Sequence, residues 1–167
     1  MLSDENVFAF KIHKTLLDIA NEVIRLSIEH KIKEIEPIPD FFRRHHNNLN
    51  NSHLRDLKRT LDSFLRSNSN QYPDSLENFD ISSKIAIARN LLNSANNPVW
   101  SSNEIVMDYL NFDKCLNNLR VIRNKYYGHL TNYQIDETKY NEILEYLKIL
   151  IKYLVQFFDP SKIAEKL

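Results

Sequence analysis

The stretch of sequence that decides the fold is IVMDYLNFDKCLNNLRVIRNKYYGH, residues 105–129. Its apolar and aromatic side chains recur in alternating steps of four and three, which is the spacing of one face of an α-helix. That face carries Ile105, Tyr109, Phe112, Leu116, Leu119, Arg123 and Tyr126. Ser101 and Glu104 form a capping-box pattern before it, and Gly128 is the only glycine in the chain. The sequence therefore predicts a long helix that opens near Ser101 and ends at Gly128.

The same periodicity predicts four further helices on either side of this one. They are expected at about residues 4–33, 53–66 and 81–93, and from near Glu137 onward. Asp80 and Asp136 stand at the N-cap positions of the last two. The first helix is expected to bury Val7, Phe8, Ile12, Leu16, Ile19, Val23 and Leu26. We expect Pro37 and Pro39 to end it, and a polar loop at about residues 42–51.

The composition agrees with an all-α fold. Hydrophobic residues make up 43% of the chain and charged residues 26%, which is ordinary for a globular protein. One glycine and five prolines leave few positions for turns with positive φ, which argues against hairpin-rich β folds. Each helix has an apolar stripe that a neighbour must cover. We therefore expect one antiparallel bundle of about five helices, formed by residues 1–167 as a single domain.

Charge and cysteine content restrict the environment and the partners. The chain has 22 basic and 22 acidic residues, so any contact with nucleic acid must rest on a local patch. Cys115 is the only cysteine, which excludes an internal disulfide and suits a reducing compartment. The first residues, MLSDE, lack a signal-peptide pattern, and the most apolar run, residues 147–158, contains two lysines. We expect a cytoplasmic protein without membrane contact.

The polar residues at the end of the central helix are the candidate catalytic group. Arg123 falls in an otherwise apolar row, which is costly unless the guanidinium is paired or lines a cleft. On an uninterrupted helix, Arg123 and His129 would sit about 120° apart. Gly128 breaks the helix first, so the imidazole can fold back toward the guanidinium. Asn124 adds an amide that donates and accepts hydrogen bonds, so we expect one site of Arg123, Asn124 and His129.

An arginine, an amide and a histidine suit RNA cleavage without a metal. The guanidinium of Arg123 can neutralise phosphate oxygens, and His129 can transfer protons near neutral pH. Together they can promote attack of an RNA 2′-hydroxyl on its neighbouring phosphate, so we predict no metal and no other cofactor. One histidine cannot serve as base and acid at the same instant. We therefore predict a homodimer in which two copies of the motif face one cleft.

Neighbouring side chains are candidates for holding RNA. Arg120 and Lys125 lie close enough in sequence to meet phosphates, and Tyr127 can stack on a base. A second basic stretch contains Arg43, Arg44, His45, His46, Arg55, Lys58, Arg59 and Arg66. It could also meet phosphates, but a solvated face is the preferred interpretation. Arg25 and His30 have a spacing similar to that of the candidate site, without a helix-breaking glycine, and we interpret them as surface residues.

The chain resembles the HEPN superfamily of helical domains, whose motif is an arginine, usually a polar residue, and a histidine after four to six intervening positions. Arg123, Asn124 and His129 fit this motif with five positions between the arginine and the histidine. Five blocks of sequence carry the resemblance, at residues 79–82, 89–91, 98–100, 123–129 and 135–140. In their order and spacing they are most similar to HEPN domains of the DAZ-interacting zinc-finger ubiquitin ligase type.

The resemblance implies a helical bundle that is often a dimer and that cleaves or binds RNA. It also implies a link to immune signalling, because relatives of this type are often attached to signalling modules. Two functions stay open. The chain is either a metal-independent endoribonuclease or a non-catalytic HEPN module that binds RNA or a protein partner. In the second case Arg123 would pair with a carboxylate such as Asp113 or Glu142, and His129 would cap the helix.

Overall fold

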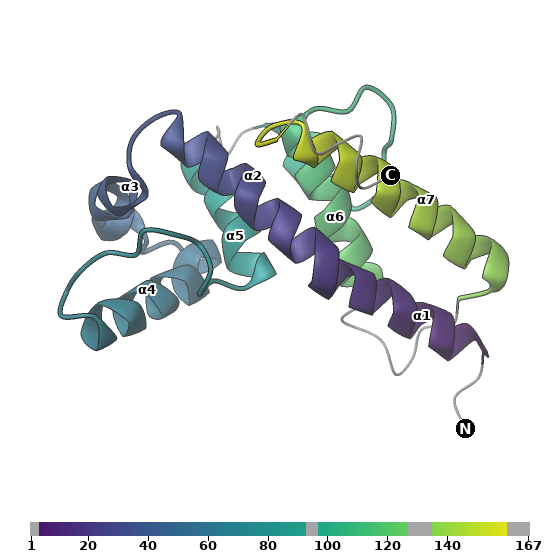
Figure 1. Cartoon of the computed structure of the whole chain (residues 1–167), viewed down its shortest axis with the longest axis horizontal. Coiled ribbons are helices and arrows are strands. Elements are labelled where there is room, and N and C mark those ends of the chain that lie inside the picture. Colours follow the sequence, from purple (N-terminus) through teal and green to yellow (C-terminus); the bar gives the residue numbers. More distant parts are fainter. Residues whose placement is uncertain (1–3, 93–96, 127–134, 160–167) are drawn as a thin grey trace. The chain divides into compact units, whose positions relative to one another are not determined.

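The computed structural model describes residues 4–92, 97–126 and 135–159, and every regular element in these ranges is helical (Figure 1). The all-α fold class predicted from the sequence is therefore confirmed. The chain divides into two compact units, one formed by residues 1–24 with 98–167 and the other by residues 25–97. We call them unit 1 and unit 2 and describe each by itself. A single domain over the whole chain stays a prediction.

Three consecutive helical segments cover the range of the first expected helix. They are α1 (Asp4–Thr15), a π-helical segment η1 (Leu16–Ala20) and α2 (Asn21–Lys33). A π-helical turn holds more residues than an α-helical turn and so changes which side chains face the core. Ile19, which the sequence places in the core, is 50% exposed, whereas Ala20 is fully buried. The limits of the helix are as predicted, but the prediction for Ile19 is wrong.

Unit 1 packs around α6 (Phe112–Tyr126). This helix contacts α1 and α7 (Glu137–Val155), and it runs against the direction of both (Figure 1). Its buried apolar side chains are Cys115, Leu116, Leu119, Val121 and Ile122. They surround most of the helix, which is typical of a helix covered by neighbours on several sides. This helix is therefore the central element of unit 1.

Both aspartates that the sequence marks as N-caps act as such. Asp80 precedes α5 (Ile81–Ile87), and its Oδ1 accepts a hydrogen bond from the backbone N–H of Ser83 at 2.7 Å. Asp136 precedes α7, and its Oδ1 accepts one from the backbone N–H of Lys139 at 2.7 Å. Each bond satisfies a donor that has no partner inside the helix. The starts of these two helices were predictable because a cap is a local device.

The structure contains a helix that was not predicted from the sequence, α3 (Ile38–His45), followed by a 3-10 turn, η2 (His46–Asn48). We expected a loop there because Pro37 and Pro39 end helices. Proline is, however, tolerated in the first turn of a helix, where a backbone N–H has no helical partner. Pro37 is the N-cap of α3 and Pro39 lies in its first turn. Both prolines therefore lie at the start of α3, after α2 has ended, and the expectation of a loop is wrong for residues 42–48.

Unit 2 has its own hydrophobic core. It is built from α3, α4 (Arg55–Ser67) and α5. A 3-10 turn, η3 (Ser52–Leu54), precedes α4, and a π-helical segment, η4 (Ala88–Leu92), continues α5. Its buried side chains include Phe41, Phe42, Leu54, Leu57, Leu61, Leu65, Leu76, Phe79, Ile81 and Ile85. The rings of Phe42 and Phe79 stack with centroids 5.3 Å apart. Leu57, Leu61 and Leu65 share one buried face of α4.

A buried carboxylate ties α2 to the loop before α5 within unit 2. Glu29 is 5% exposed, and its Oε1 accepts a hydrogen bond from the backbone N–H of Leu76 at 2.8 Å. Arg25 pairs with the same carboxylate at 3.1 Å and is half-buried. Buried charges need such partners because removing an ion from water is costly. The interpretation of Arg25 as a surface residue is therefore wrong, because its guanidinium partners a buried carboxylate.

Candidate functional site

The last turn of α6 carries the described part of the candidate catalytic group. Arg123 is half-buried, and Asn124 and Lys125 are exposed. Tyr127 and His129 lie outside the described residues, so their distance from Arg123 stays a prediction. Arg123 and Lys125 both belong to the last turn of the helix, where cations interact favourably with its negative end.

Arg120 joins α6 to the segment that precedes it. Its Nε donates to Oδ1 of Asn117 at 2.9 Å, and its Nη2 donates to the carbonyl oxygen of Ser102 at 2.9 Å. The side chain is half-buried. These bonds give Arg120 a structural part in unit 1, because they hold a backbone carbonyl eighteen positions earlier in the chain. An RNA phosphate would have to share this guanidinium, so the role of Arg120 in RNA binding stays a prediction.

The long helix expected from Ser101 onward begins eleven residues later, at Phe112. Ser101 ends a 3-10 turn, η5 (Pro98–Ser101), and its hydroxyl donates to the carbonyl oxygen of Pro98 at 2.7 Å. The predicted capping box of Ser101 and Glu104 is therefore wrong. Asn111 does the capping instead, since its Oδ1 accepts a hydrogen bond from the backbone N–H of Lys114 at 2.8 Å.

An extended loop, residues 102–111, takes the place of the missing helical turns. Tyr109, expected on the buried stripe, is 95% exposed and has a φ of 51°, in the left-handed region. Its ring therefore adds nothing to the core. A bulky residue rarely adopts this conformation unless the surrounding structure fixes it.

Two buried asparagines on α6 fix this loop. Asn118 is 1% exposed, and its side-chain amide accepts from the backbone N–H of Val106 at 2.9 Å and donates to the Val106 carbonyl at 2.8 Å. Asn117 is 2% exposed and donates to the carbonyl oxygen of Ser102 at 3.2 Å. Buried amides need partners, and the loop backbone provides them. The pair of asparagines within an apolar helix was the sequence signal that we did not use.

A cavity of about 270 Å³ lies between the loop and α6. Asn117, Asn118 and Lys114 line it, and each already bonds to the loop: the Lys114 ammonium donates to the carbonyl oxygen of Asp108. Trp100, in one of the HEPN-like sequence blocks, is 2% exposed and belongs to the core of unit 1. The cavity is therefore a part of the loop anchorage, since its polar groups are engaged within the protein.

Neither the cysteine nor a metal-binding cluster offers chemistry in the described part of the chain. Burial raises the pKa of the Cys115 thiol far above its ordinary value, and its Sγ donates to the carbonyl oxygen of Leu150 at 3.2 Å. A thiol kept protonated in this way is a poor nucleophile.

The described residues contain no group of three or more His, Cys, Asp or Glu side chains placed to hold a metal ion. Among the same residues, no helix combines the length and the apolar character needed to cross a bilayer.

The second basic stretch is held largely by local contacts in unit 2. Arg43 pairs with Asp40, and Arg44 pairs with Glu36 at 2.6 Å. His46 bonds through Nε2 to Asp62 at 2.8 Å and through Nδ1 to the hydroxyl of Tyr72 at 2.9 Å. His46 is therefore a structural link between α4, η2 and the following loop. Arg59 of α4 differs, because it lines a pocket.

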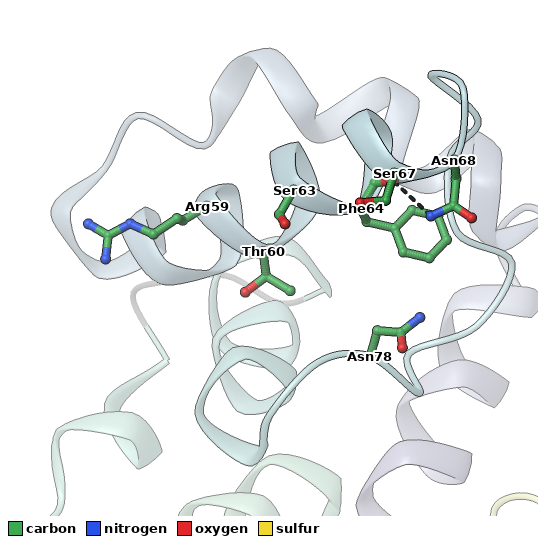
Figure 2. Close-up of a pocket in the computed structure, with 7 residues that line it drawn as sticks. All are labelled: Arg59, Thr60, Ser63, Phe64, Ser67, Asn68 and Asn78. Carbon is green, nitrogen blue, oxygen red and sulfur yellow. Dashed lines mark hydrogen bonds between the residues drawn. The ribbon is translucent and has the colours of Figure 1, made fainter.

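This pocket, of about 610 Å³, lies along α4 and was not anticipated from the sequence (Figure 2). Its lining residues are Arg59, Thr60, Ser63, Phe64, Ser67, Asn68 and Asn78. Six of these seven are polar, and the single charge among them is positive. Such a lining favours a polar or anionic ligand over an apolar one.

The HEPN resemblance rests on the residues of the sequence blocks themselves. Of these blocks, the described residues include the N-cap Asp80, the buried Trp100 and the N-cap Asp136. Each has a structural role that a helical domain of another family could also use. Comparisons of the chain with family models, with curated proteins and with solved structures found no match.

Proposed function

We propose that the chain is a metal-independent endoribonuclease with a site of Arg123, Asn124 and His129. The supporting observation is the last turn of α6, where a half-buried arginine is followed by an exposed asparagine and an exposed lysine. A guanidinium at the edge of a core is partly desolvated, so it would interact more strongly with a phosphate than an arginine in open water. The His129 imidazole, six positions further on, would supply the proton transfer.

In the proposed reaction, the 2′-oxygen of a ribose attacks the adjacent phosphorus, and the bond from phosphorus to the 5′-oxygen breaks. The 2′-hydroxyl gives its proton to one imidazole, and a second proton donor protonates the leaving 5′-oxygen. A homodimer would provide that donor as the second copy of His129. Arg123 stabilises the charge on the phosphoryl oxygens. Asn124 orients the side chain of either Arg123 or His129. The products are a 2′,3′-cyclic phosphate and a 5′-hydroxyl end.

Lys125, Arg120 and Tyr127 are the proposed RNA contacts around the reacting phosphate. Lys125 is exposed and close to Arg123 in the same helical turn, so it would meet a neighbouring phosphate. We place the reaction in the cytoplasm, where single-stranded RNA is present.

The test is cleavage of single-stranded RNA by the purified chain in excess EDTA, with analysis of the product ends. Removing a general acid or base lowers a reaction rate by about 10²–10⁴-fold. The cleavage rate of His129→Ala should therefore be lower than that of the parent by about the same factor. Arg123→Ala should lose cleavage as well. His30→Ala is the matched control, because His30 lies on α2 and pairs only with Glu34 among the described residues. If His129→Ala cuts as fast as His30→Ala, the proposed site is wrong.

The second candidate function is a non-catalytic HEPN module that binds RNA or a protein partner, with a role in immune signalling. One observation favours it: Arg123 and Lys125 occupy the position where cations stabilise the negative end of a helix, a purely structural use. A correctly folded protein that binds RNA and leaves it intact would support this function. Sedimentation of the parent chain would separately test the proposed homodimer.

A further inference from the structure

The pocket on α4 has free hydrogen-bonding groups along one wall. Thr60, Ser63 and Ser67 follow one another at intervals of three and four, so their hydroxyls share one side of the helix. Figure 2 shows Thr60 and Ser63 directed from α4 into the pocket, with Asn78 facing them from the loop. Helical serines and threonines often donate to a carbonyl one turn earlier. Within the described chain, none of these four side chains makes a hydrogen bond.

Asn68 shows the contrast, since its amide is already engaged. Its Nδ2 donates to the carbonyl oxygen of Phe64 at 2.8 Å, the bond drawn in Figure 2. Phe64 is half-buried and lines the same pocket with its ring. The pocket therefore offers three hydroxyls, one unengaged amide and one aromatic surface. This set matches a ligand with several hydroxyl groups and a flat or apolar part.

A row of arginines runs beside the pocket. Arg55, Arg59 and Arg66 are exposed, and their spacing puts them on one side of α4, from which Arg59 lines the pocket. The side chain of Arg59 is 73% exposed, and its ion pair with Asp56 is long, at 3.9 Å. Ten other residues separate Arg55 from Arg66, so the row is roughly 16 Å long at 1.5 Å per residue. α4 has four cationic and two acidic residues, a local excess of +2 in a chain of zero net charge.

The length of the row distinguishes between ligands of similar chemistry. A free nucleotide or a sugar phosphate would meet one arginine and leave the others unused. A chain of linked phosphates would meet several, and its riboses would bring hydroxyl groups to the opposite wall. The bases of a duplex are already paired and stacked on one another, whereas an unpaired base can stack on Phe64.

We propose that this pocket and the arginine row bind a segment of single-stranded RNA. Phosphates lie along Arg55, Arg59 and Arg66, ribose hydroxyls bond to Ser63 and its neighbours, and one base contacts Phe64. The proposal uses residues of unit 2 alone. It goes beyond the proposed cleavage site, and it holds or fails whether or not His129 is catalytic.

The experiment is a fluorescence anisotropy titration of the full chain with a labelled single-stranded RNA of about 12 nucleotides, within the usual range of site sizes. His129→Ala protein is used throughout, so that the RNA stays intact. Arg59→Ala should weaken binding and lower the slope of log affinity against log salt by about 0.7, the value for one lost phosphate contact on a single strand. Arg43→Ala is the matched control, because it removes the same charge from an arginine that pairs with Asp40 on α3.

A second variant distinguishes RNA binding in the pocket from non-specific electrostatic attraction to the arginines. Ser63→Leu fills the pocket without any change in charge, and Ser63 is exposed, so the fold should tolerate it. It should weaken binding about fivefold, the equivalent of one lost hydrogen bond. If its melting temperature falls, Thr60→Val replaces it. The proposal is overturned if the pocket variants bind RNA as the control does, or if single-stranded DNA of the same sequence binds as tightly as RNA.

Discussion

The side-chain amide of Asn118 accepts a hydrogen bond from the backbone N–H of Val106 and donates one to the backbone carbonyl of the same residue, twelve positions earlier. The amide pairs with the backbone N–H and the backbone carbonyl as a neighbouring strand would. Since Asn118 is 1% exposed, water cannot readily take the place of the loop. This pairing, together with the bonds of Asn117 and Arg120 to the Ser102 carbonyl, holds residues 102–111 as a loop against α6.

Asn118→Ala should lower the free energy of unfolding by about 2 kcal/mol, because two hydrogen bonds are lost and a small cavity remains. Chemical denaturation followed by circular dichroism measures the change. Limited proteolysis should also cut within residues 102–111 sooner than in the parent. Asn124→Ala, an exposed asparagine on the same helix, should change the stability by less than about 0.5 kcal/mol. Equal losses in the two variants would show that the Val106 pairing does not anchor the loop.

Tyr109→Asn should stabilise the chain, by about 0.5–1 kcal/mol, because asparagine tolerates the left-handed region better than tyrosine. The ring of Tyr109 is 95% exposed, so little packing is lost. The melting temperature measures the effect. Tyr109→Val is the comparison, since a β-branched residue is still less favourable at a φ of 51° and should destabilise. A stabilising valine would contradict the strained conformation.

Glu29→Ala should lower the free energy of unfolding by about 3 kcal/mol, because the backbone N–H of Leu76 and the guanidinium of Arg25 both lose their acceptor. Urea denaturation gives the value. Glu34→Ala is the matched control, in the turn directly after the same helix. Its carboxylate is 55% exposed and pairs with His30 at the surface, so its removal should cost no more than about 1 kcal/mol. A loss as small in Glu29→Ala would mean that the loop before α5 is held by other contacts.

His45 should make unit 2 less stable in mild acid. Its ring packs on Phe41 with centroids 4.6 Å apart, and within the described residues its buried Nε2 makes no hydrogen bond. Burial, and next the charge of Arg44, lower the pKa of His45 below its ordinary 6.5. Folding therefore favours the neutral ring. Above the pKa of His45 in the unfolded chain, the ring is neutral in both states and the free energy of unfolding is unaffected. As the pH falls below that pKa, the free energy of unfolding decreases.

His45→Phe removes this titration and keeps an aromatic ring against Phe41. Thermal melts from pH 7.5 to pH 5, roughly the range over which histidine titrates, should show the parent losing stability relative to His45→Phe as the pH falls. The two proteins share every other ionisable group, so the difference isolates His45. A difference that does not vary with pH would contradict the lowered pKa.

Local signals in the sequence predicted the parts of the fold that depend on neighbouring residues. Asp80 and Asp136 cap helices because each carboxylate needs only the backbone N–H three positions ahead. The leucines of α4 are buried because their helical spacing puts them on one face. At the candidate site, the sequence correctly placed Arg123 and Asn124 on the central helix of unit 1, and the approach of His129 to Arg123 stays a prediction.

The errors have three causes: a contact with a distant part of the chain, a proline that can either end or begin a helix, and a π-helical turn. The sequence predicted a helix for residues 102–111 because it does not show that the amides of Asn117 and Asn118 bond to this segment, twelve or more residues away. Pro39 reads as a helix breaker, yet a proline in the first turn also starts a helix. The π-helical turn before Asn21 moved Ile19 out of the core, and periodicity alone does not reveal such an insertion.

The sequence by itself determined an all-α fold and the main helices, because helical periodicity and capping act within one or two turns. Only the tertiary structure decided that residues 102–111 form a loop, that Glu29 is buried, and that the hydroxyls of α4 border a pocket. These features depend on which backbone groups and side chains meet across dozens of residues. A buried polar group takes whatever partner the packed chain brings to it, and spacing along the sequence does not specify that partner.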